Sequence, residues 1–216
     1  MRRTLLCVAT LALGGCSVLG PLPDRSRYYT VTSVAPQAGT PPDAPAAQQT
    51  KSYGLGPVTL PTYLDRREVA TRVSPTEMRY SRRARWAEPL ALTVSTALLQ
   101  DLTARLPGAP VIGYPWLGGS QIDYQVVIHV QRFESDISGS GVLHAQWLVT
   151  DSHTGARIVV RETEIAEPSA THHASPAVAL GRFSDEIAVE LRQLPPHATP
   201  RHEKAKLRYD AHIDAR

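Results

Sequence analysis

The spacing of apolar residues near the end of the chain is the feature that most limits its possible folds. Large apolar residues between positions 180 and 194 follow one another at steps of three or four: Leu180, Phe183, Ile187, Leu191 and Leu194. Because an α-helix turns once every ~3.6 residues, this spacing predicts a helix with one apolar stripe, which Pro195 and Pro196 end. The stripe must be buried, so the rest of the chain has to supply a matching apolar surface.

A second helix is predicted over residues 89–106. Pro89 suits a first helical turn, and residues 106–108, Leu-Pro-Gly, end the helix. Its apolar face repeats every four residues, at Leu90, Val94, Leu98 and Leu102.

Most of the remaining chain up to residue 166 has the β-branched content or the alternation of β-strands. Strands are predicted at residues 28–34, 53–60, 68–74, 111–114, 124–131, 142–150 and 157–166, and a turn at residues 74–77 leads to residues 78–80. Pro57 indicates an edge strand or a bulge. The order strands, helix, strands, helix predicts an α+β protein of a single domain, with a mixed β-sheet and both amphipathic helices packed on one face.

Two segments lack the residues that build a core. Residues 35–50 contain four prolines and no large apolar side chain, which predicts a flexible insertion within the domain. Residues 195–216 form a charged, histidine-bearing tail that we expect to be disordered. The folded domain is therefore expected at residues 28–194, after a polar tether at residues 16–27.

The first residues have the pattern of a secretory signal. Arg2 and Arg3 precede an apolar run at residues 5–13, which is shorter than the roughly 20 residues that span a bilayer. Residues 13–16, Leu-Gly-Gly-Cys, resemble the bacterial lipobox; the alternative is an ordinary signal with an incidental cysteine. The resemblance implies that residues 1–15 are removed, Cys7 with them, and that Cys16 is acylated.

A lipid anchor at Cys16 would determine where the protein resides. Two or more acyl chains hold a protein stably on a membrane without any spanning helix. By resemblance to the bacterial sorting rule, Ser17 in place of Asp directs the lipoprotein to the outer membrane. We therefore expect the protein on the periplasmic face of the outer membrane.

Several short blocks, in order, resemble a known family. They are Gly-Pro-Val-Thr-Leu-Pro at 56–61, Leu-Asp-Arg at 64–66, Arg-Trp-Ala-Glu-Pro-Leu at 85–90, Tyr-Pro-Trp at 114–116 and Gln-Arg-Phe-Glu at 131–134. With the lipobox, they resemble the PqiC-like family, the ABC-type transport auxiliary lipoprotein components, over residues 28–194. The resemblance implies a non-enzymatic component of an MCE-type intermembrane lipid transport system that docks the MCE-domain protein at the outer membrane.

The sequence leaves other functions open. A structural assembly factor for outer-membrane proteins or lipopolysaccharide is the main alternative, and a periplasmic hydrolase is a weaker one. Homo-oligomers are also possible. Nucleic acid is excluded as a partner, because the chain carries a secretory signal and a net charge of only +3.

The histidines do not form a recognisable catalytic or metal site. The spacing of His144, Asp151 and His153 matches no ligand signature, and His172 and His173 lie in a polar, proline-flanked stretch typical of a solvated loop. The chain has no G-x-S-x-G, H-E-x-x-H or Walker motif. We therefore expect no catalytic residue, no metal and no cofactor.

A cluster of arginines beside aromatic residues is the strongest candidate binding surface. It comprises Arg79, Arg82, Arg83 and Arg85. These guanidiniums are candidates for contact with the acidic patch of a partner or with phospholipid headgroups. The alternative is a solvated strand end. The neighbouring Trp86 is expected to pack in the core beside Leu90.

Overall fold

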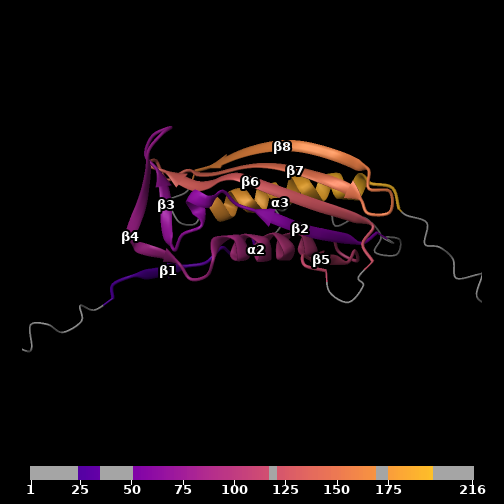
Figure 1. Ribbon diagram of the computed structural model, residues 1–216, viewed down its shortest axis with the longest axis horizontal. Coiled ribbons are helices and arrows are strands. Elements are labelled where there is room, and N and C mark those ends of the chain that lie inside the picture. Colours follow the sequence, from indigo (N-terminus) through magenta and orange to yellow (C-terminus); the bar gives the residue numbers. More distant parts are fainter. Residues whose placement is uncertain (1–23, 35–50, 117–120, 169–174, 197–216) are drawn as a thin grey trace, which may run out of the picture.

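The computed structural model describes residues 24–34, 51–116, 121–168 and 175–196, and within these it contains eight strands and two long helices (Figure 1). In chain order the elements are β1 (Arg27–Tyr29), β2 (Tyr53–Thr59), a 3-10 helix (Thr62–Leu64), β3 (Glu68–Arg72), β4 (Met78–Trp86), α2 (Leu90–Arg105), β5 (Val111–Gly113), β6 (Tyr124–Asp136), β7 (Gly141–Asp151), β8 (Arg157–Glu167) and α3 (Ser175–Gln193). The predicted α+β class is confirmed.

The sheet divides into two branches along one side of β6. On its other side β6 pairs antiparallel with β7, which pairs antiparallel with β8. On the branching side the first half of β6 pairs with β2, and its last two residues pair with β3, both in parallel. One branch continues from β2 to β5, and the other from β3 to β4 and β1. The sheet is therefore mixed, as predicted.

The two helices bury their apolar stripes on one face of this sheet. Leu180, Phe183, Ile187 and Leu191 of α3 are fully buried, as are Val94, Leu98 and Leu102 of α2. These side chains join the inward-facing residues of the central strands in one apolar core. Figure 1 shows α3 beneath β6, β7 and β8, with α2 alongside β2 and β5.

Some element boundaries differ from the prediction because of distant partners. The strand predicted at residues 28–34 is only β1, because the chain beyond it leaves the sheet and Ser33 and Val34 bind the buried carboxylate of Asp101. Strand β4 continues to Trp86, since β1 and β3 pair with it on both sides. Pro57 lies at a register irregularity between Leu55 and Val58, as the bulge prediction requires. The edge-strand alternative is wrong, since β2 lies between β5 and β6.

Several sequence predictions concern residues outside the described part of the chain. They include the signal at residues 1–15, the acylation of Cys16, the insertion at residues 35–50, His172 and His173, and most of the tail. Among the described residues, no helix is long and apolar enough to cross a membrane.

Candidate functional site

The predicted arginine cluster lies on strand β4. Arg79, Arg82 and Arg83 are exposed and Arg85 is half-buried. Trp86, the last residue of the strand, has an exposed fraction of only 5%, so its predicted place in the core is confirmed.

A bulge in β4 explains why the adjacent residues Arg82 and Arg83 are both exposed. Neighbouring residues of a regular strand point to opposite faces of the sheet. Here the pairing with β3 is irregular, and β4 has additional residues between its pairs with Glu68 and Ala70. The hydroxyl of Ser81 accepts hydrogen bonds from the backbone N–H of Arg83 at 3.2 Å and of Ala84 at 2.9 Å. The bulge is therefore stabilised by its own side chain.

Strand β1 adds two further arginines to the same surface. It pairs in parallel with the end of β4, placing Arg27 opposite Ala84. Arg25, Arg27 and Arg83 line an open basin of about 470 Å³, together with Tyr29, Ser81 and Ala84. Arg25 and Arg27 lie in the predicted tether, residues 16–27. The sequence does contain a signal that they act together: they are two positions apart, and residues i and i+2 of an extended chain lie on the same face.

The branch β3–β4–β1 and its flanking residues form what we call the arginine-rich end. Its basic members are Arg25, Arg27, Arg66, Arg67, Arg72, Arg79, Arg82, Arg83 and Arg85. Within the described chain, residues 24–34 and 61–86 carry these nine arginines against four carboxylates, whereas the remaining described residues carry seven basic against twelve acidic side chains. Two carboxylates of β6, Glu134 and Asp136, also adjoin this end, and with them included the nine arginines still outnumber the acidic side chains there.

Two charged side chains of the arginine-rich end, Arg66 and Asp24, are positioned by contacts with their neighbours. The guanidinium of Arg66 stacks over the ring of Tyr80, with 4.5 Å between its central carbon and the ring centroid. Hydrogen bonds from the Ser26 hydroxyl and backbone lower the pKa of Asp24, and Tyr28 and the charge of Arg85 add to this. The Asp24 carboxylate is therefore stabilised in its ionised form.

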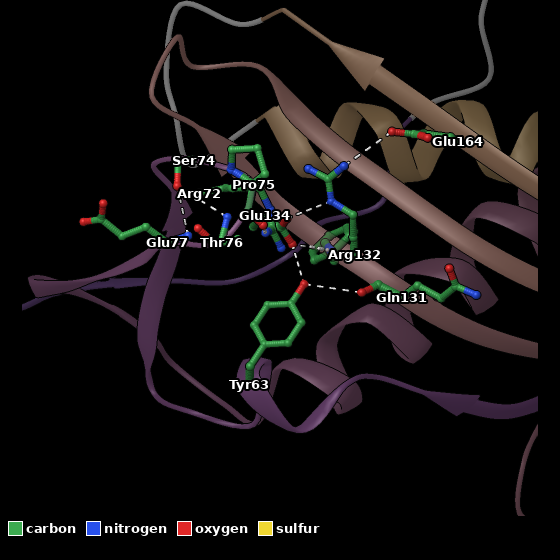
Figure 2. A network of polar contacts seen from close by, with 11 residues as sticks. Tyr63, Arg72, Ser74, Pro75, Thr76, Glu77, Gln131, Arg132, Glu134 and Glu164 are labelled. Carbon is green, nitrogen blue, oxygen red and sulfur yellow. Dashed lines mark hydrogen bonds and ion pairs between the residues drawn. The ribbon is translucent and has the colours of Figure 1, made fainter.

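A buried carboxylate connects the arginine-rich end to the central strand (Figure 2). Glu134 of β6 has an exposed fraction of 2%. Its carboxylate accepts hydrogen bonds from Arg72 Nε at 2.7 Å, Arg132 Nε at 3.0 Å, the Tyr63 hydroxyl at 2.7 Å and the Phe133 backbone N–H at 3.0 Å. The β3–β6 ladder itself consists of two residue pairs, and this carboxylate adds hydrogen bonds from β3 and the 3-10 helix to β6.

The electrostatics of this network indicate a structural role. Burial alone would raise the pKa of Glu134, but the hydrogen bonds from Arg72, Tyr63 and Arg132 outweigh it and lower that pKa. Burial and the neighbouring carboxylate raise the pKa of the Tyr63 hydroxyl. Glu134 is therefore ionised, with four donors already bound, and is not available as a general base. The predicted strand ends at residue 131, whereas β6 continues to Asp136, so Glu134 lay beyond the prediction; the available signal was a glutamate directly after Phe133.

A second buried network joins the two helices. Asp101 of α2 is fully buried and accepts the Val34 backbone N–H at 2.8 Å. Arg105, 3% exposed, bonds Asp185 of α3 through Nε at 2.6 Å and the carbonyl oxygen of Gly181 at 3.0 Å. These contacts fix α2, α3 and the chain after β1 relative to one another.

The histidines that the structure describes do not come together. His144 Nε2 lies 2.7 Å from Glu162 Oε1, and His153 Nε2 lies 3.1 Å from Asp123 Oδ1 at the other end of β7. Asp151 accepts the backbone N–H of His153 at 2.8 Å, as expected of a hairpin turn with a polar cap. Among the described residues, no group of three or more His, Cys, Asp or Glu side chains is arranged to hold a metal ion.

Comparisons with known proteins agree with the fold and the sequence blocks. The family model described as "ABC-type transport auxiliary lipoprotein component" matches residues 29–191. The intermembrane transport lipoprotein PqiC of Escherichia coli (strain K12) is 28% identical over 200 residues, which cover 90% of this chain and 100% of PqiC. The Shigella flexneri protein of the same name matches to the same extent.

Two crystal structures show the same fold. One, of an uncharacterized protein, has a TM-score of 0.62 and 21% identity, covering 77% of this chain and 98% of that protein. The other, of a protein from Xanthomonas campestris, has a TM-score of 0.56 and 20% identity, covering 77% of this chain and 92% of that protein.

Proposed function

Since the chain belongs to the family of ABC-type transport auxiliary lipoprotein components, we propose that it serves an MCE-type intermembrane lipid transport system as a non-enzymatic auxiliary component. In this role it docks the MCE-domain protein at the periplasmic face of the outer membrane. The observation that carries the proposal is the extent of the family match, which runs from the end of β1 into the last turns of α3.

The lipid anchor is the part of the proposal that the sequence supports most directly. Residues 13–16 resemble a lipobox, and PqiC, which matches over its whole length, is named a lipoprotein. We place the acyl chains on Cys16 after removal of residues 1–15, and the tether at residues 16–27. The residue after the cysteine is serine, which favours the outer membrane.

A transport role without catalysis is consistent with the chemistry of the buried groups. PqiC is named an intermembrane transport lipoprotein. The buried carboxylates of Glu134 and Asp101 both accept hydrogen bonds within the fold, which supports structural roles for them.

The proposal is tested by isolating the protein with its partners. The full-length protein, tagged at its C-terminus, is purified from detergent-solubilised envelopes and its companions are identified by mass spectrometry. We expect an MCE-domain protein and a permease. Recovery of outer-membrane protein or lipopolysaccharide assembly factors in their place would favour the alternative function and contradict ours.

The anchor is tested separately. Labelling with radioactive palmitate should mark the wild-type protein and not the Cys16→Ala variant, which should also leave the outer-membrane fraction. An unlabelled wild-type protein would refute the anchor.

A further inference from the structure

We propose that the arginine-rich end lies against the membrane that holds the Cys16 anchor and binds the phosphate groups of its anionic phospholipids. This inference rests on the lipid anchor of the proposed function. It adds a second membrane contact, made by the folded domain itself, which would orient the protein on the surface.

The length of the tether places the arginine-rich end near the membrane. Asp24, the first described residue, lies eight positions after Cys16 and three before β1. Eight residues reach at most about 29 Å when fully extended. The thirteen-residue strand β6 is about 43 Å long, and the β7–β8 turn lies at the end of it away from β3. Cys16 is therefore tethered to the arginine-rich end and not to the opposite end of the sheet.

The separation of charge favours the same orientation. An anionic surface attracts the arginine-rich end, where nine arginines face six carboxylates once Glu134 and Asp136 of β6 are included, and it repels the remaining fold, with its seven basic and ten acidic groups. Each basic residue close to an anionic membrane strengthens binding by about fivefold. The orientation that satisfies the tether is thus also the one that the charges favour.

The side chains of the basin suit phosphate. Arg25, Arg27 and Arg83 converge on it, and a guanidinium binds phosphate through two parallel hydrogen bonds. Among the described residues, no carboxylate lines the basin. An acidic protein surface would also satisfy the charges, but only the membrane is brought to this end by the tether.

The test measures whether anionic lipid protects these arginines. The acylated full-length protein is reconstituted into nanodiscs of phosphatidylcholine alone or of phosphatidylcholine mixed with phosphatidylglycerol. Phenylglyoxal then modifies accessible arginines, and mass spectrometry gives the rate at each position. We expect modification of Arg25, Arg27 and Arg83 to slow by about fivefold in the anionic discs and to recover in high salt. Arg157, exposed at the opposite end of the sheet, should react equally in both.

Matched variants make the result specific. Replacing Arg27 and Arg83 by Gln should reduce the protection of Arg25, whereas replacing Arg157 and Arg161 by Gln should leave it unchanged. Equal rates in the two kinds of disc, or equal slowing at Arg157, would overturn the proposal. Protection that appears only when the co-purified MCE-domain protein is added would also overturn it, and would assign the surface to that protein.

The mass of the N-terminal peptide separates failure of this inference from failure of the anchor. Protein without acyl chains at Cys16 contradicts the proposed anchor. Acylated protein whose arginines remain unprotected contradicts the headgroup contact alone.

Discussion

Replacing Glu134 by Gln tests whether the buried carboxylate connects the arginine-rich end to the central strand. The substitution preserves the shape of the side chain and removes its charge. Glu134 accepts four hydrogen bonds with its two oxygens, whereas Gln has one accepting oxygen and a donating NH2 group. The change in stability caused by the substitution therefore reports the loss of hydrogen bonds and charge, and not a loss of packing.

The contacts determine which orientation of the new amide costs less. With its oxygen toward Arg72 and Arg132, the amide directs its NH2 group toward the Tyr63 hydroxyl and the Phe133 backbone N–H. Figure 2 shows Tyr63 on this side of Glu134. The Tyr63 hydroxyl can then accept a hydrogen bond and donate its own proton to the Gln131 carbonyl, 3.3 Å away. The buried Phe133 N–H cannot accept and loses its bond to this side chain. The flipped amide would instead leave both guanidiniums facing a donor.

The expected cost follows from these losses. A buried N–H without a partner costs about 1–3 kcal/mol. The two arginines lose a charged acceptor, but their side chains are 21% and 30% exposed, so water offsets part of that loss and about 1 kcal/mol remains. The free energy of unfolding should fall by about 2–4 kcal/mol, which lowers the melting temperature by roughly 10 °C in a domain of this size.

The assay is urea unfolding of both proteins from neutral to acid pH. The pKa of Glu134 is lowered in the folded state. The stability due to its charge is therefore complete above the ordinary carboxyl value of 4.5 and is lost as the pH falls through the lower folded value. The difference between wild type and Glu134→Gln should shrink on acidification.

A control substitution at Glu164 and a hydrogen-exchange measurement complete the test of Glu134. Glu164→Gln removes the exposed partner of Arg132, and its cost should stay within about 1 kcal/mol. Hydrogen exchange should speed up in β3 and β4 of the Glu134→Gln protein before it does in β7. A Glu134→Gln protein within about 0.5 kcal/mol of wild type at pH 7, or a difference that persists at acid pH, would refute the reasoning.

Two further predictions concern the core and the histidines. Trp86→Ala should lower the free energy of unfolding by about 3–5 kcal/mol, because the side chain is 5% exposed and belongs to the core. Tyr28→Ala, at an exposed position, should change the free energy of unfolding little. Equal melting temperatures of the two variants would contradict this prediction. Replacing His144, His153, His172 and His173 together by Ala should lower the free energy of unfolding by less than about 2 kcal/mol, since the ion pairs of His144 and His153 are surface contacts. Recovery of the MCE-domain protein should stay unchanged. Loss of that recovery in a protein with unchanged melting would reveal a function for these side chains.

Local sequence information is sufficient for both helices and for the class of the fold. The apolar stripe from Leu180 to Leu194 and the repeat from Leu90 to Leu102 predict both helices, because helical periodicity appears in the spacing of residues that are close in the chain. The mixed sheet followed, since two single-stripe helices and several strands can bury their apolar faces in few arrangements. Trp86 was placed in the core by its neighbours in the chain.

The sequence by itself thus determined the elements, the fold class and the family, whereas only the tertiary structure decided how the candidate surface is assembled. The pairing of Arg27 with Ala84 joins strands that are far apart in the chain. The bulge that exposes both Arg82 and Arg83 depends on register, and the Glu134 network gathers side chains from a 3-10 helix, β3 and β6. The alternation within a strand indicates which residues share a face. The partner strand and the pairing register, however, are determined by the free energy of all long-range contacts together. For that reason Arg25 and Arg27 resemble tether residues in the sequence and become part of a basic surface in the fold.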